Sequence, residues 1–282
     1  MDTEPSGLVA VCAASGALGR LVVDRLLDRL PAEQIAVVVR RPAAVADLAA
    51  RGVQVRHGDY DRPESLVKAF DAAARLLLIS SPELDPGRRV SQHLGAVEAA
   101  RSAGVGALAY TSVLGADVSD AGVAAAHHAT EKAILASGLP YTMLRHPFYS
   151  EAFLAPQALR AAVTAGELAD PTAGRGINTA FRADLAGAAV QVLTGSGHAG
   201  RGYDLTGPPW TYPELAATLT RVSGVPVACR PQPQEIPGPM GWLYAQARAG
   251  TLERQTDDLA HLLGHPATTV EQAVTAALTA TA

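Results

Sequence analysis

The sequence predicts an α/β protein with a doubly wound parallel sheet and a smaller C-terminal lobe. First, an apolar run at residues 8–11 leads into small residues and then into an amphipathic segment from Leu21. Second, further short apolar runs alternate with helical patterns, and successive parallel strands need such crossover helices. Third, strand patterns become rarer after residue 150. Together these observations indicate a Rossmann-type domain followed by a lobe that binds substrate.

Composition narrows the class of protein. The chain has 282 residues, of which 48% are hydrophobic and 18% are charged, which is ample for a packed core. A formal net charge of -4 indicates no basic surface for nucleic acid or for an anionic membrane, so neither partner is expected. No apolar run approaches the roughly 18 residues of a membrane span, and the polar start of the chain is unlike a signal peptide. We therefore expect a globular cytoplasmic protein.

The cysteines and other reactive residues suggest neither a metal site nor a hydrolase. Cys12 and Cys229 lie far apart, and no CxxC pair or Cys/His cluster has the spacing of zinc ligands. We expect both thiols to be reduced, with Cys12 as a small buried residue at the end of the first strand. The GxSxG motif of a nucleophile elbow is also absent from the sequence.

The turn after the first strand has the composition of a phosphate-binding loop. Residues 13–19 read AASGALG, and side chains this small let backbone amides and a helix N-terminus approach a pyrophosphate. The usual spacing places glycines at 13, 16 and 19, but the first of these is Ala13. Its methyl group is tolerated only if an L-residue can reach the backbone angle of this turn. Close packing of a strand on a helix is the alternative explanation for such small residues.

Short apolar runs and helical segments alternate along the chain. The strands predicted for the sheet are 8–11, 35–39, 53–56, 75–81, 107–112 and 141–145. The helices predicted with them are 21–30, 43–50, 63–70, 88–103, 121–137 and 184–193. Later strand candidates are 177–181, 203–206 and 225–229.

Capping boxes and prolines mark the rest of the C-terminal part. Thr211 with Glu214, and Thr268 with Glu271, each fit a capping box and so predict two helix starts. Residues 231–239 contain four prolines and predict an extended connector rather than a helix.

Arg40 follows the second strand and bears on the choice of cofactor. In this kind of fold an acidic residue about 20 positions after the glycine turn binds a ribose 2′-hydroxyl, whereas arginine accommodates a 2′-phosphate. Arg40 therefore favours NADP(H) over NAD(H), the alternative being two solvated arginines at a strand end. After the third strand, Asp59 and Tyr60 lie in a polar turn at the edge where an adenine would rest, although Asp59 could also cap the next helix.

Ligands of open parallel sheets bind outside the carboxyl ends of the strands. The predicted strands place five polar residues at this edge, namely Ser15, Arg40, Asp59, Ser80 and Thr111. We therefore expect a nucleotide to bind along this edge.

Long blocks of the sequence are similar to a known family. They are SGALGR at 15–20, VVVRRP at 37–42, HGDYDRPESL at 57–66, RVSQHLGAVEAARSAGV at 89–105, YTSVLGAD at 110–117, HHATEKAILASGLPYTMLR at 127–145 and YDLTGPPWTYPELAATL at 203–219. In these blocks the chain resembles the NmrA-like branch of the short-chain dehydrogenase/reductase superfamily, and within it the type 2 quinone oxidoreductases. The likeness spans roughly residues 8–230.

This resemblance implies a nicotinamide dinucleotide at the first turn and a substrate cleft between two lobes. The implied cofactor-binding residues are Ala13, Ser15, Gly16, Ala17, Leu18, Gly19, Arg40, Asp59, Tyr60, Ser80, Ser81, Thr111, Lys132, Pro147 and Phe148. Among them, residues 15–18 would bind the pyrophosphate, Arg40 the 2′-phosphate, Asp59 with Tyr60 the adenine, Ser80 with Ser81 the nicotinamide ribose, and residues 147–149 the nicotinamide ring. The expected substrate-binding residues are Val113, Leu114, Phe148, Tyr149 and Phe153. The aromatic residues Phe148, Tyr149, Phe153 and Trp210 would suit a flat, conjugated substrate, the alternative being that they pack in the core.

Two departures from the family pattern affect these expectations. Ala13 replaces the first glycine, and His146-Pro147-Phe148 stands where type 2 quinone reductases usually have Asn-Gly-Trp. We therefore expect a substrate pocket that differs from that of the type 2 quinone reductases.

A histidine and a lysine one helical turn apart form the candidate catalytic pair. The superfamily usually has a tyrosine followed four residues later by a lysine, and here this spacing reads His128-x-x-x-Lys132. Histidine titrates near neutral pH and can act as an acid, while the lysine can hold the cofactor ribose. The alternative is that hydride transfer needs only positioning and that His128 merely lines its helix. The neighbouring His127 and Glu131 are interpreted as a packing and hydrogen-bonding pair.

The sequence thus favours an NADPH-dependent reductase that passes hydride to a flat quinone-like or other conjugated carbonyl compound. His128 would protonate the product, Lys132 would orient the ribose and Tyr149 would shape the pocket. Two alternatives stay open, an NADP-sensing regulatory protein that acts through a protein partner and a non-redox isomerase or cyclase on the same fold. The oligomeric state is also open, with a homodimer as one candidate. The expected domains are 1–147 with a returning segment 178–206, and 148–177 with 207–282.

Overall fold

The computed structural model describes residues 7–232 and 236–279, and the chain divides into two units. The first unit comprises Met1–His146 and Arg182–Leu205, and the second comprises Pro147–Phe181 and Thr206–Ala282. The return to the first unit therefore begins at Arg182, four residues later than the sequence predicted. The reason is that β9 (Thr179–Ala180) pairs with β7 (Phe148–Tyr149), which holds this segment in the second unit.

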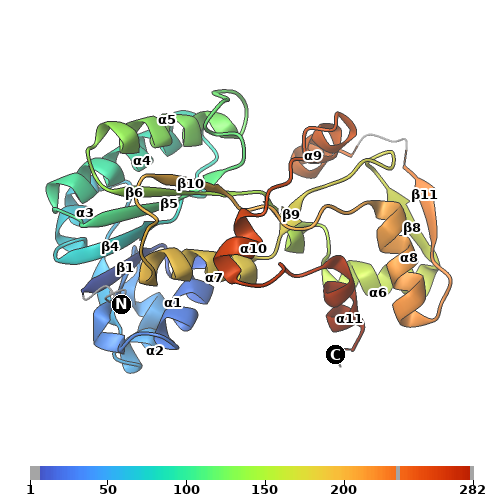
Figure 1. Ribbon diagram of the computed structural model, residues 1–282, viewed down its shortest axis with the longest axis horizontal. Coiled ribbons are helices and arrows are strands. Elements are labelled where there is room, and N and C mark those ends of the chain that lie inside the picture. Colours follow the sequence, from blue (N-terminus) through green and yellow to red (C-terminus); the bar gives the residue numbers. More distant parts are fainter. Residues whose placement is uncertain (1–6, 233–235, 280–282) are drawn as a thin grey trace. The chain divides into compact units, whose positions relative to one another are not determined.

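A seven-stranded parallel sheet forms the centre of the first unit (Figure 1), in the order β10-β6-β5-β4-β1-β2-β3. Its strands are β1 (Leu8–Cys12), β2 (Ile35–Val39), β3 (Gln54–His57), β4 (Ala73–Leu78), β5 (Ala107–Val113), β6 (Tyr141–His146) and β10 (Arg201–Asp204). Every residue of β2 is buried, as its unbroken apolar run requires of a strand covered on both faces. The predicted Rossmann-type sheet is confirmed.

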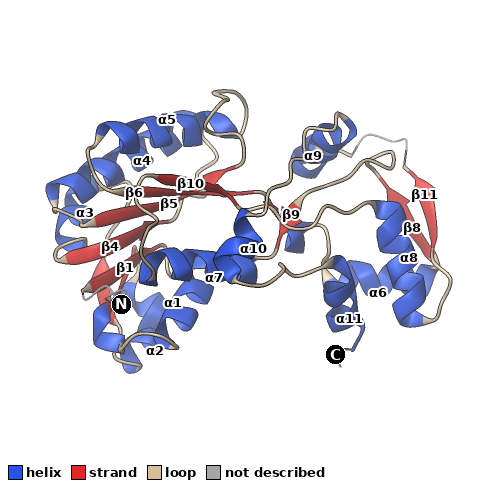
Figure 2. Ribbon diagram, viewed as in Figure 1, coloured by secondary structure: helices blue, strands red, loops and turns tan. Residues whose placement is uncertain are grey.

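Helices cover both faces of this sheet (Figure 2). They are α1 (Ala17–Leu27), α2 (Ala46–Ala50), α3 (Pro63–Ala69), α4 (Pro86–Ser102), α5 (Ala124–Ala136) and α7 (Arg182–Thr194), with short 3-10 turns η1 (Ala32–Gln34) and η2 (Pro42–Val45). On one face α3 packs against α4 and α4 against α5, while α1 packs against α7 on the other. The crossover helices thus leave the carboxyl edge of the sheet accessible to the loops that follow the strands.

The second unit has a core of its own. Its elements are β7, β8 (Glu167–Asp170), β9, β11 (Ala228–Pro231), α6 (Pro156–Ala165), α8 (Tyr212–Ser223), α9 (Gly238–Arg248), α10 (Asp258–Leu263), α11 (Val270–Thr279) and a 3-10 turn η3 (Ser150–Ala152). β8 and β11 form a parallel pair. Trp210, Leu215 and Leu219 are buried in a core that also includes residues from α6 and α11.

Several sequence predictions for this unit need correction. The strand predicted at 225–229 is shifted to β11 and belongs to a separate small sheet, and only Thr179–Ala180 of the strand predicted at 177–181 is assigned to a strand. The connector predicted at 231–239 is interrupted, because Pro231 ends β11 and α9 begins at Gly238; residues 233–235 lie outside the described residues. Strands this short depend on pairing partners from distant sequence, which local patterns do not reveal.

One predicted capping box is confirmed and the other is wrong by one residue. Thr211 caps α8, with Glu214 bonding back to its backbone N–H. In α11, however, Thr269 forms this pair with Gln272: the Thr269 hydroxyl accepts from the Gln272 N–H, and Gln272 Oε1 accepts from the Thr269 N–H. The glutamine supplies the same acceptor as a glutamate, so the reciprocal geometry is satisfied one position later.

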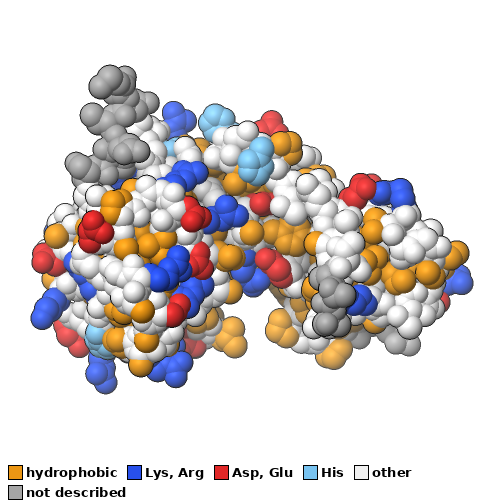
Figure 3. All heavy atoms as spheres, turned by 90° about the horizontal axis from the view of Figure 1, so that it is seen from below, with side chains coloured by type: hydrophobic (Ala, Val, Ile, Leu, Met, Phe, Trp, Pro, Cys, Tyr) orange, Lys and Arg blue, Asp and Glu red, His pale blue; other side chains and the backbone are white. Residues whose placement is uncertain are grey.

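The surface carries both signs of charge. On the face shown in Figure 3, cationic and anionic side chains are interspersed over the first unit. Among the described residues, none of the helices is long and apolar enough to cross a membrane.

Candidate functional site

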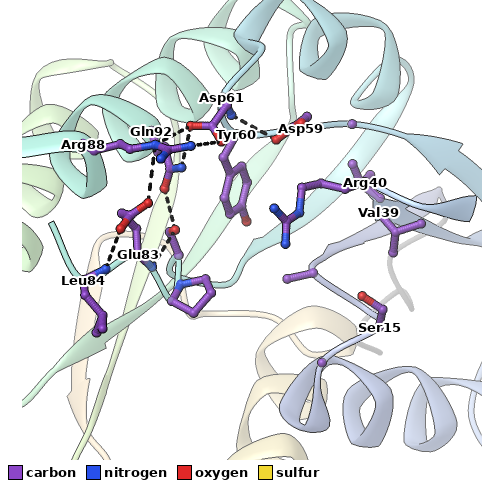
Figure 4. A pocket seen from close by; sticks show the side chains of 16 residues that line it. Ser15, Val39, Arg40, Asp59, Tyr60, Asp61, Glu83, Leu84, Arg88 and Gln92 are labelled. Atoms are coloured by element: carbon purple, nitrogen blue, oxygen red, sulfur yellow. Dashed lines mark hydrogen bonds and ion pairs between the residues drawn. The ribbon is translucent and has the colours of Figure 1, made fainter. Parts of the chain in front are cut away.

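A cavity of about 510 Å³ opens at the carboxyl edge of the sheet, within the first unit. Its walls come from the turn after β1, the loops after β2, β3 and β4, and the first turns of α4 (Figure 4). Seven of the predicted cofactor residues line it: Ala13, Ser15, Gly16, Arg40, Asp59, Tyr60 and Ser81. Residues from five separate segments of the sequence therefore meet at one edge, which is where an open parallel sheet binds ligands.

The turn after β1 accepts alanine by adopting a left-handed backbone. Ala13 has φ of 52°, donates its N–H to Val38 O at 3.0 Å, and accepts from Gly16 N–H at 2.9 Å. The left-handed conformation costs an alanine about 1–2 kcal/mol relative to glycine. Gly19 has no such freedom, because a Cβ there would lie 2.7 Å from Ala13 O. The turn therefore tolerates a methyl group at position 13 but not at position 19.

The N-terminus of α1 has backbone N–H groups that no described side chain caps. Gly16 is its N-cap, and within the described residues no side chain caps the helix and no acidic residue lies in its first turn. The N–H groups at the start of a helix have no intrahelical partners, and the helix dipole is positive at this end. Ala17 and Leu18, in the first turn beside Ser15, thus present a backbone surface suited to a phosphate group.

Arg40 places the one unpaired guanidinium at this cavity. It is exposed, and in Figure 4 its head group points into the cavity between Tyr60 and Ser15. In the part of the chain that the structure describes, Arg40 forms no hydrogen bond or ion pair. Its positive charge helps to lower the pKa of Asp61 across the cavity.

The acidic and basic residues opposite Arg40 were missed by the sequence analysis. Arg88 holds Asp61 with two hydrogen bonds, Nε to Oδ1 at 3.1 Å and Nη2 to Oδ2 at 2.7 Å, and lies 3.4 Å from Glu83. Gln92 donates to the same Asp61 carboxylate at 2.7 Å. The Arg88 guanidinium and the Gln92 amide together lower the pKa of Asp61 to about 2. The rule that located Asp59, a loop directly after a parallel strand, extends to Asp61 and Glu83 and could have found them.

Asp59 and Tyr60 are positioned by their own turn. Asp59 Oδ1 accepts from Asp61 N–H at 3.1 Å, which closes the turn. The N-cap of α3 is Arg62, so Asp59 does not cap that helix. Tyr60 donates its hydroxyl to Ile79 O at 2.7 Å and lies beside Cys12. Cys12 is buried as predicted, and this burial raises the pKa of its thiol to about 12.

The loop after β4 is held from three directions. Thr111 Oγ1, at the end of β5, accepts from Ser80 N–H at 2.9 Å. Ser81 is buried, and its hydroxyl donates to Gln92 Oε1 at 2.5 Å while its N–H donates to His93 Nε2 at 2.8 Å. The hydroxyl of Ser81 is therefore already engaged, which leaves Ser80 as the less buried of the two serines predicted beside the ribose.

A buried network behind this loop requires two neutral histidines. Because the Ser81 N–H can only donate, His93 Nε2 is an acceptor, and the proton on Nδ1 is donated to Thr130 Oγ1 at 2.9 Å. Arg89 also can only donate, so His127 Nε2 accepts its bond at 3.0 Å and His127 Nδ1–H is donated to the Tyr110 hydroxyl at 2.8 Å. Burial, reinforced by Arg89, lowers the pKa of His93 to about 4 and that of His127 to about 3.

The interpretation of His127 and Glu131 as a pair is wrong. His127 bonds Arg89 and Tyr110, whereas Glu131 accepts two bonds from Arg145, at 2.9 and 2.8 Å. Glu131 also accepts from Ser112 Oγ at 2.6 Å. His127 and Glu131 lie one helical turn apart on α5, but they share no partner: His127 bonds residues of α4 and β5, and Glu131 bonds residues of β5 and β6.

The candidate catalytic pair lies on α5. His128 is half-buried, and its Nδ1–H donates to Ala116 O at 2.7 Å, in the loop after β5 that also carries Val113 and Leu114. This bond leaves Nε2 as the atom able to exchange a proton. Lys132 is exposed one turn further along the same helix. The catalytic and substrate-binding roles of these residues stay predictions.

The remaining predicted residues belong to the second unit. Pro147 is buried there, Phe148 and Tyr149 form β7, and the ring of Phe148 meets Trp242 edge-on at 6.2 Å. Phe153 is only 7% exposed and packs edge-on against Trp210 and Tyr244. Its ring is part of the core of the second unit, and its predicted contact with substrate stays a prediction.

Known proteins resemble this chain along nearly its whole length. A model of an NAD(P)H-binding family matches residues 13–195. Quinone oxidoreductase 2 of Escherichia coli K12 is 39% identical over 284 residues, which cover 95% of this chain and 97% of that protein. The structure of the Citrobacter sp. triphenylmethane reductase complexed with NADP(H) matches with a TM-score of 0.90 at 38% identity, covering 96% of this chain and 99% of that one.

A second solved structure, of a quinone oxidoreductase, also matches nearly the whole chain. The NADPH-dependent quinone oxidoreductase of Escherichia coli complexed with NADPH matches with a TM-score of 0.84 at 38% identity, covering 95% of this chain and 98% of that one. The family model begins at Ala13, in the turn that lines the cavity, and runs through α7. The chain therefore belongs to the NAD(P)H-binding family, in the NmrA-like branch that its sequence blocks resemble.

Proposed function

We propose that the protein is an NADPH-dependent reductase that transfers a hydride to quinone-like or other conjugated acceptors. The observation that carries this proposal is Arg40, an arginine without a carboxylate partner at the cavity beside an uncapped helix N-terminus. The relatives support it, since two full-length matches at 38% identity are a quinone oxidoreductase complexed with NADPH and a dye reductase complexed with NADP(H).

The residues at the cavity suit the parts of such a cofactor. The N–H groups at the start of α1 would bind the pyrophosphate, and the Arg40 guanidinium would bind the 2′-phosphate through charge-assisted hydrogen bonds. Asp59 and Tyr60 would border the adenine, and Ser80 with Thr111 would border the nicotinamide ribose. When bound, the nicotinamide ring supplies the hydride, and the protein supplies position and exclusion of water.

His128 is the proposed source of the proton that accompanies the hydride. Its Nδ1–H is held by Ala116 O, so the ring can deliver a proton only from Nε2 and only in its protonated form. Lys132 would orient the ribose from the same helix, and Tyr149 and Phe148 would shape the acceptor site. Reduction of a quinone to its hydroquinone consumes one hydride and one proton, and this proton would come from Nε2.

The cofactor assignment is tested by the exchange of Arg40 for alanine. Loss of a charge-assisted contact to phosphate should raise the KM for NADPH about 10–100-fold and leave the KM for NADH nearly unchanged. Arg41→Ala is the matched control, because the neighbouring arginine does not line the cavity. The assay follows oxidation of each nucleotide with a simple quinone. Binding of NADPH without any turnover would instead favour the NADP-sensing protein, and failure to bind either nucleotide would favour a non-redox enzyme.

The proton donor has a separate test. His128→Phe should lower kcat about 10²-fold or more if Nε2 protonates the product. An unchanged rate in His128→Phe would remove the residue from the mechanism.

We also propose a cytoplasmic protein whose partner is a small flat substrate rather than nucleic acid, and a homodimer as its assembly. On the face in Figure 3 the positive and negative side chains are interspersed, which supports the absence of nucleic-acid binding. Sedimentation at several protein concentrations tests the homodimer, with a single monomeric species as the result that contradicts it.

A further inference from the structure

The cavity contains more acidic groups than basic ones. Asp59, Asp61 and Glu83 line it together with only two arginines, Arg40 and Arg88. A phosphate group that enters this cavity is repelled by each free carboxylate, and each carboxylate also competes with the phosphate for Arg40. Binding of a 2′-phosphate therefore depends on whether these carboxylates are paired with other cations.

Arg88 pairs with two of these carboxylates, those of Asp61 and Glu83. It donates two hydrogen bonds to Asp61 and lies 3.4 Å from Glu83, so one guanidinium bridges the loops that follow β3 and β4 (Figure 4). Glu83 is held in place by its own loop, where its Oε1 accepts from Leu84 N–H at 2.8 Å and from Asp85 N–H at 3.1 Å. Gln92 also bonds Asp61, but a neutral amide cannot compensate a charge.

Asp61 is the acid that would act on Arg40 if it were released. Arg40 already contributes to the low pKa of Asp61, after the contributions of Arg88 and Gln92. Arg40 and Asp61 thus interact electrostatically, although they form no ion pair in the described chain. Without Arg88, the Asp61 carboxylate has Arg40 as the other cation at this cavity to compensate it.

We propose that Arg88 is a positioning residue for cofactor selection, which holds Asp61 and Glu83 so that the Arg40 guanidinium stays available to a 2′-phosphate. This inference rests on the proposed binding of NADPH. Arg88 itself lies on α4, outside the turn after β1 and the end of β2 from which such folds bind the phosphates.

The test measures calorimetric Kd values for NADP⁺ and NAD⁺ without any acceptor, and KM values with a quinone. Arg88→Ala should weaken NADP⁺ binding about tenfold and change NAD⁺ binding less than about twofold, with kcat at saturating NADPH retained. Arg88→Lys, which keeps the charge but cannot form both bonds, should have an intermediate effect. Arg101→Ala is the matched control, because it removes an exposed bidentate pair with Glu98 from the same helix away from the cavity.

Rescue distinguishes electrostatic positioning from a structural role. Arg88→Ala combined with Asp61→Asn should recover most of the preference for NADP⁺, because the competing charge is gone. Equal weakening of both nucleotides, an unchanged ratio, or absence of rescue would each overturn the inference.

Arg40→Ala in the same titrations separates this inference from the proposed function. If Arg40→Ala abolishes the preference for NADP⁺ and Arg88→Ala leaves it intact, the cofactor assignment stands and only the role of Arg88 is wrong. If Arg40→Ala also leaves the preference unchanged, the 2′-phosphate does not bind at Arg40 and the proposed cofactor site fails.

Discussion

Two pairs of residues, each one helical turn apart on α4, belong to polar networks in opposite environments. Arg88 and Gln92 face the cavity, where they bond the Asp61 carboxylate near solvent. Arg89 and His93, each one position further along, face α5 and β5 and join a network with His127 and Tyr110. A shift of one residue rotates a helical side chain by about 100° and so moves it from one environment to the other. The exposed ion pair of Arg88 and Asp61 can keep full charges, whereas the buried network depends on neutral imidazole rings.

The comparison teaches that burial decides what a polar network contributes. Side chains of the exposed pair retain their charge at little cost, so they can act on the charge of a ligand while contributing little to folding. In the buried network every donor must find an acceptor, and the loss of one partner leaves a polar group unpaired. We expect the exposed network to control cofactor preference and the buried one to control stability.

The largest expected effect is acid destabilisation by the buried histidines. The pKa values of His93, His127 and His146 are lowered by burial to about 4, 3 and 3, below the ordinary value of 6.5 that they regain on unfolding. Their stabilisation is complete above pH 6.5 and is lost as the pH falls toward those values, because the unfolded chain then binds more protons. Each histidine costs about 1.4 kcal/mol of unfolding free energy per pH unit in this window.

Urea unfolding between pH 8 and pH 4.5 measures this slope. Exchange of the exposed His261 for glutamine is the control and should leave the slope unchanged. A free energy of unfolding that stays flat below pH 6.5 would contradict the assignment of neutral buried rings.

The next largest effect is expected from the loss of a buried ion pair, compared with the loss of an exposed one. Arg145 is the counter-ion of the buried Glu131 and lies 3.2 Å from Asp117, with side-chain exposures of 14% for Arg145 and 6% for Glu131. Arg145→Ala should lower the free energy of unfolding by about 3–5 kcal/mol, because a buried carboxylate loses its partner. Arg101→Ala, which breaks the exposed pair with Glu98, should lower it far less. Equal losses in the two variants would show that burial is not the deciding variable.

A smaller effect tests the buried hydroxyl alone. Tyr110→Phe removes the acceptor of His127 Nδ1–H and should cost about 1–3 kcal/mol in chemical denaturation. Tyr141→Phe is the control, since in the described residues the Tyr141 hydroxyl forms no hydrogen bond. If both variants unfold at the same denaturant concentration, the network does not stabilise the fold.

The smallest effect is expected for the exposed pair. Arg88→Ala should shift the thermal midpoint by no more than about 1 °C, because an exposed ion pair is screened and contributes little to folding. The same variant should still change the preference for NADP⁺. A midpoint lower by several degrees would mean that Arg88 orders the loop after β4, and the difference between the two networks would disappear.

The parallel sheet and the edge at which its cavity lies followed from local patterns. Apolar runs of strand length, separated by helical segments, require parallel pairing, and parallel pairing brings the carboxyl ends of strands to one edge. Ser15, Arg40 and Asp59 were therefore placed at the cavity from the sequence, and the structure brings them there. The short strands of the second unit were not found in the same way, because β8 and β11 pair across about 60 residues of sequence.

The sequence by itself determined the sheet, the small-residue turn and the arginine at the end of β2, since each is encoded by neighbours in the chain. Only the tertiary structure decided that Ala13 adopts a left-handed backbone, that Arg88 and Gln92 hold Asp61, and that His127 and Glu131 have separate partners. These features depend on which face of each helix meets which loop. Such faces are set by packing between distant segments, and periodicity along one segment does not specify them.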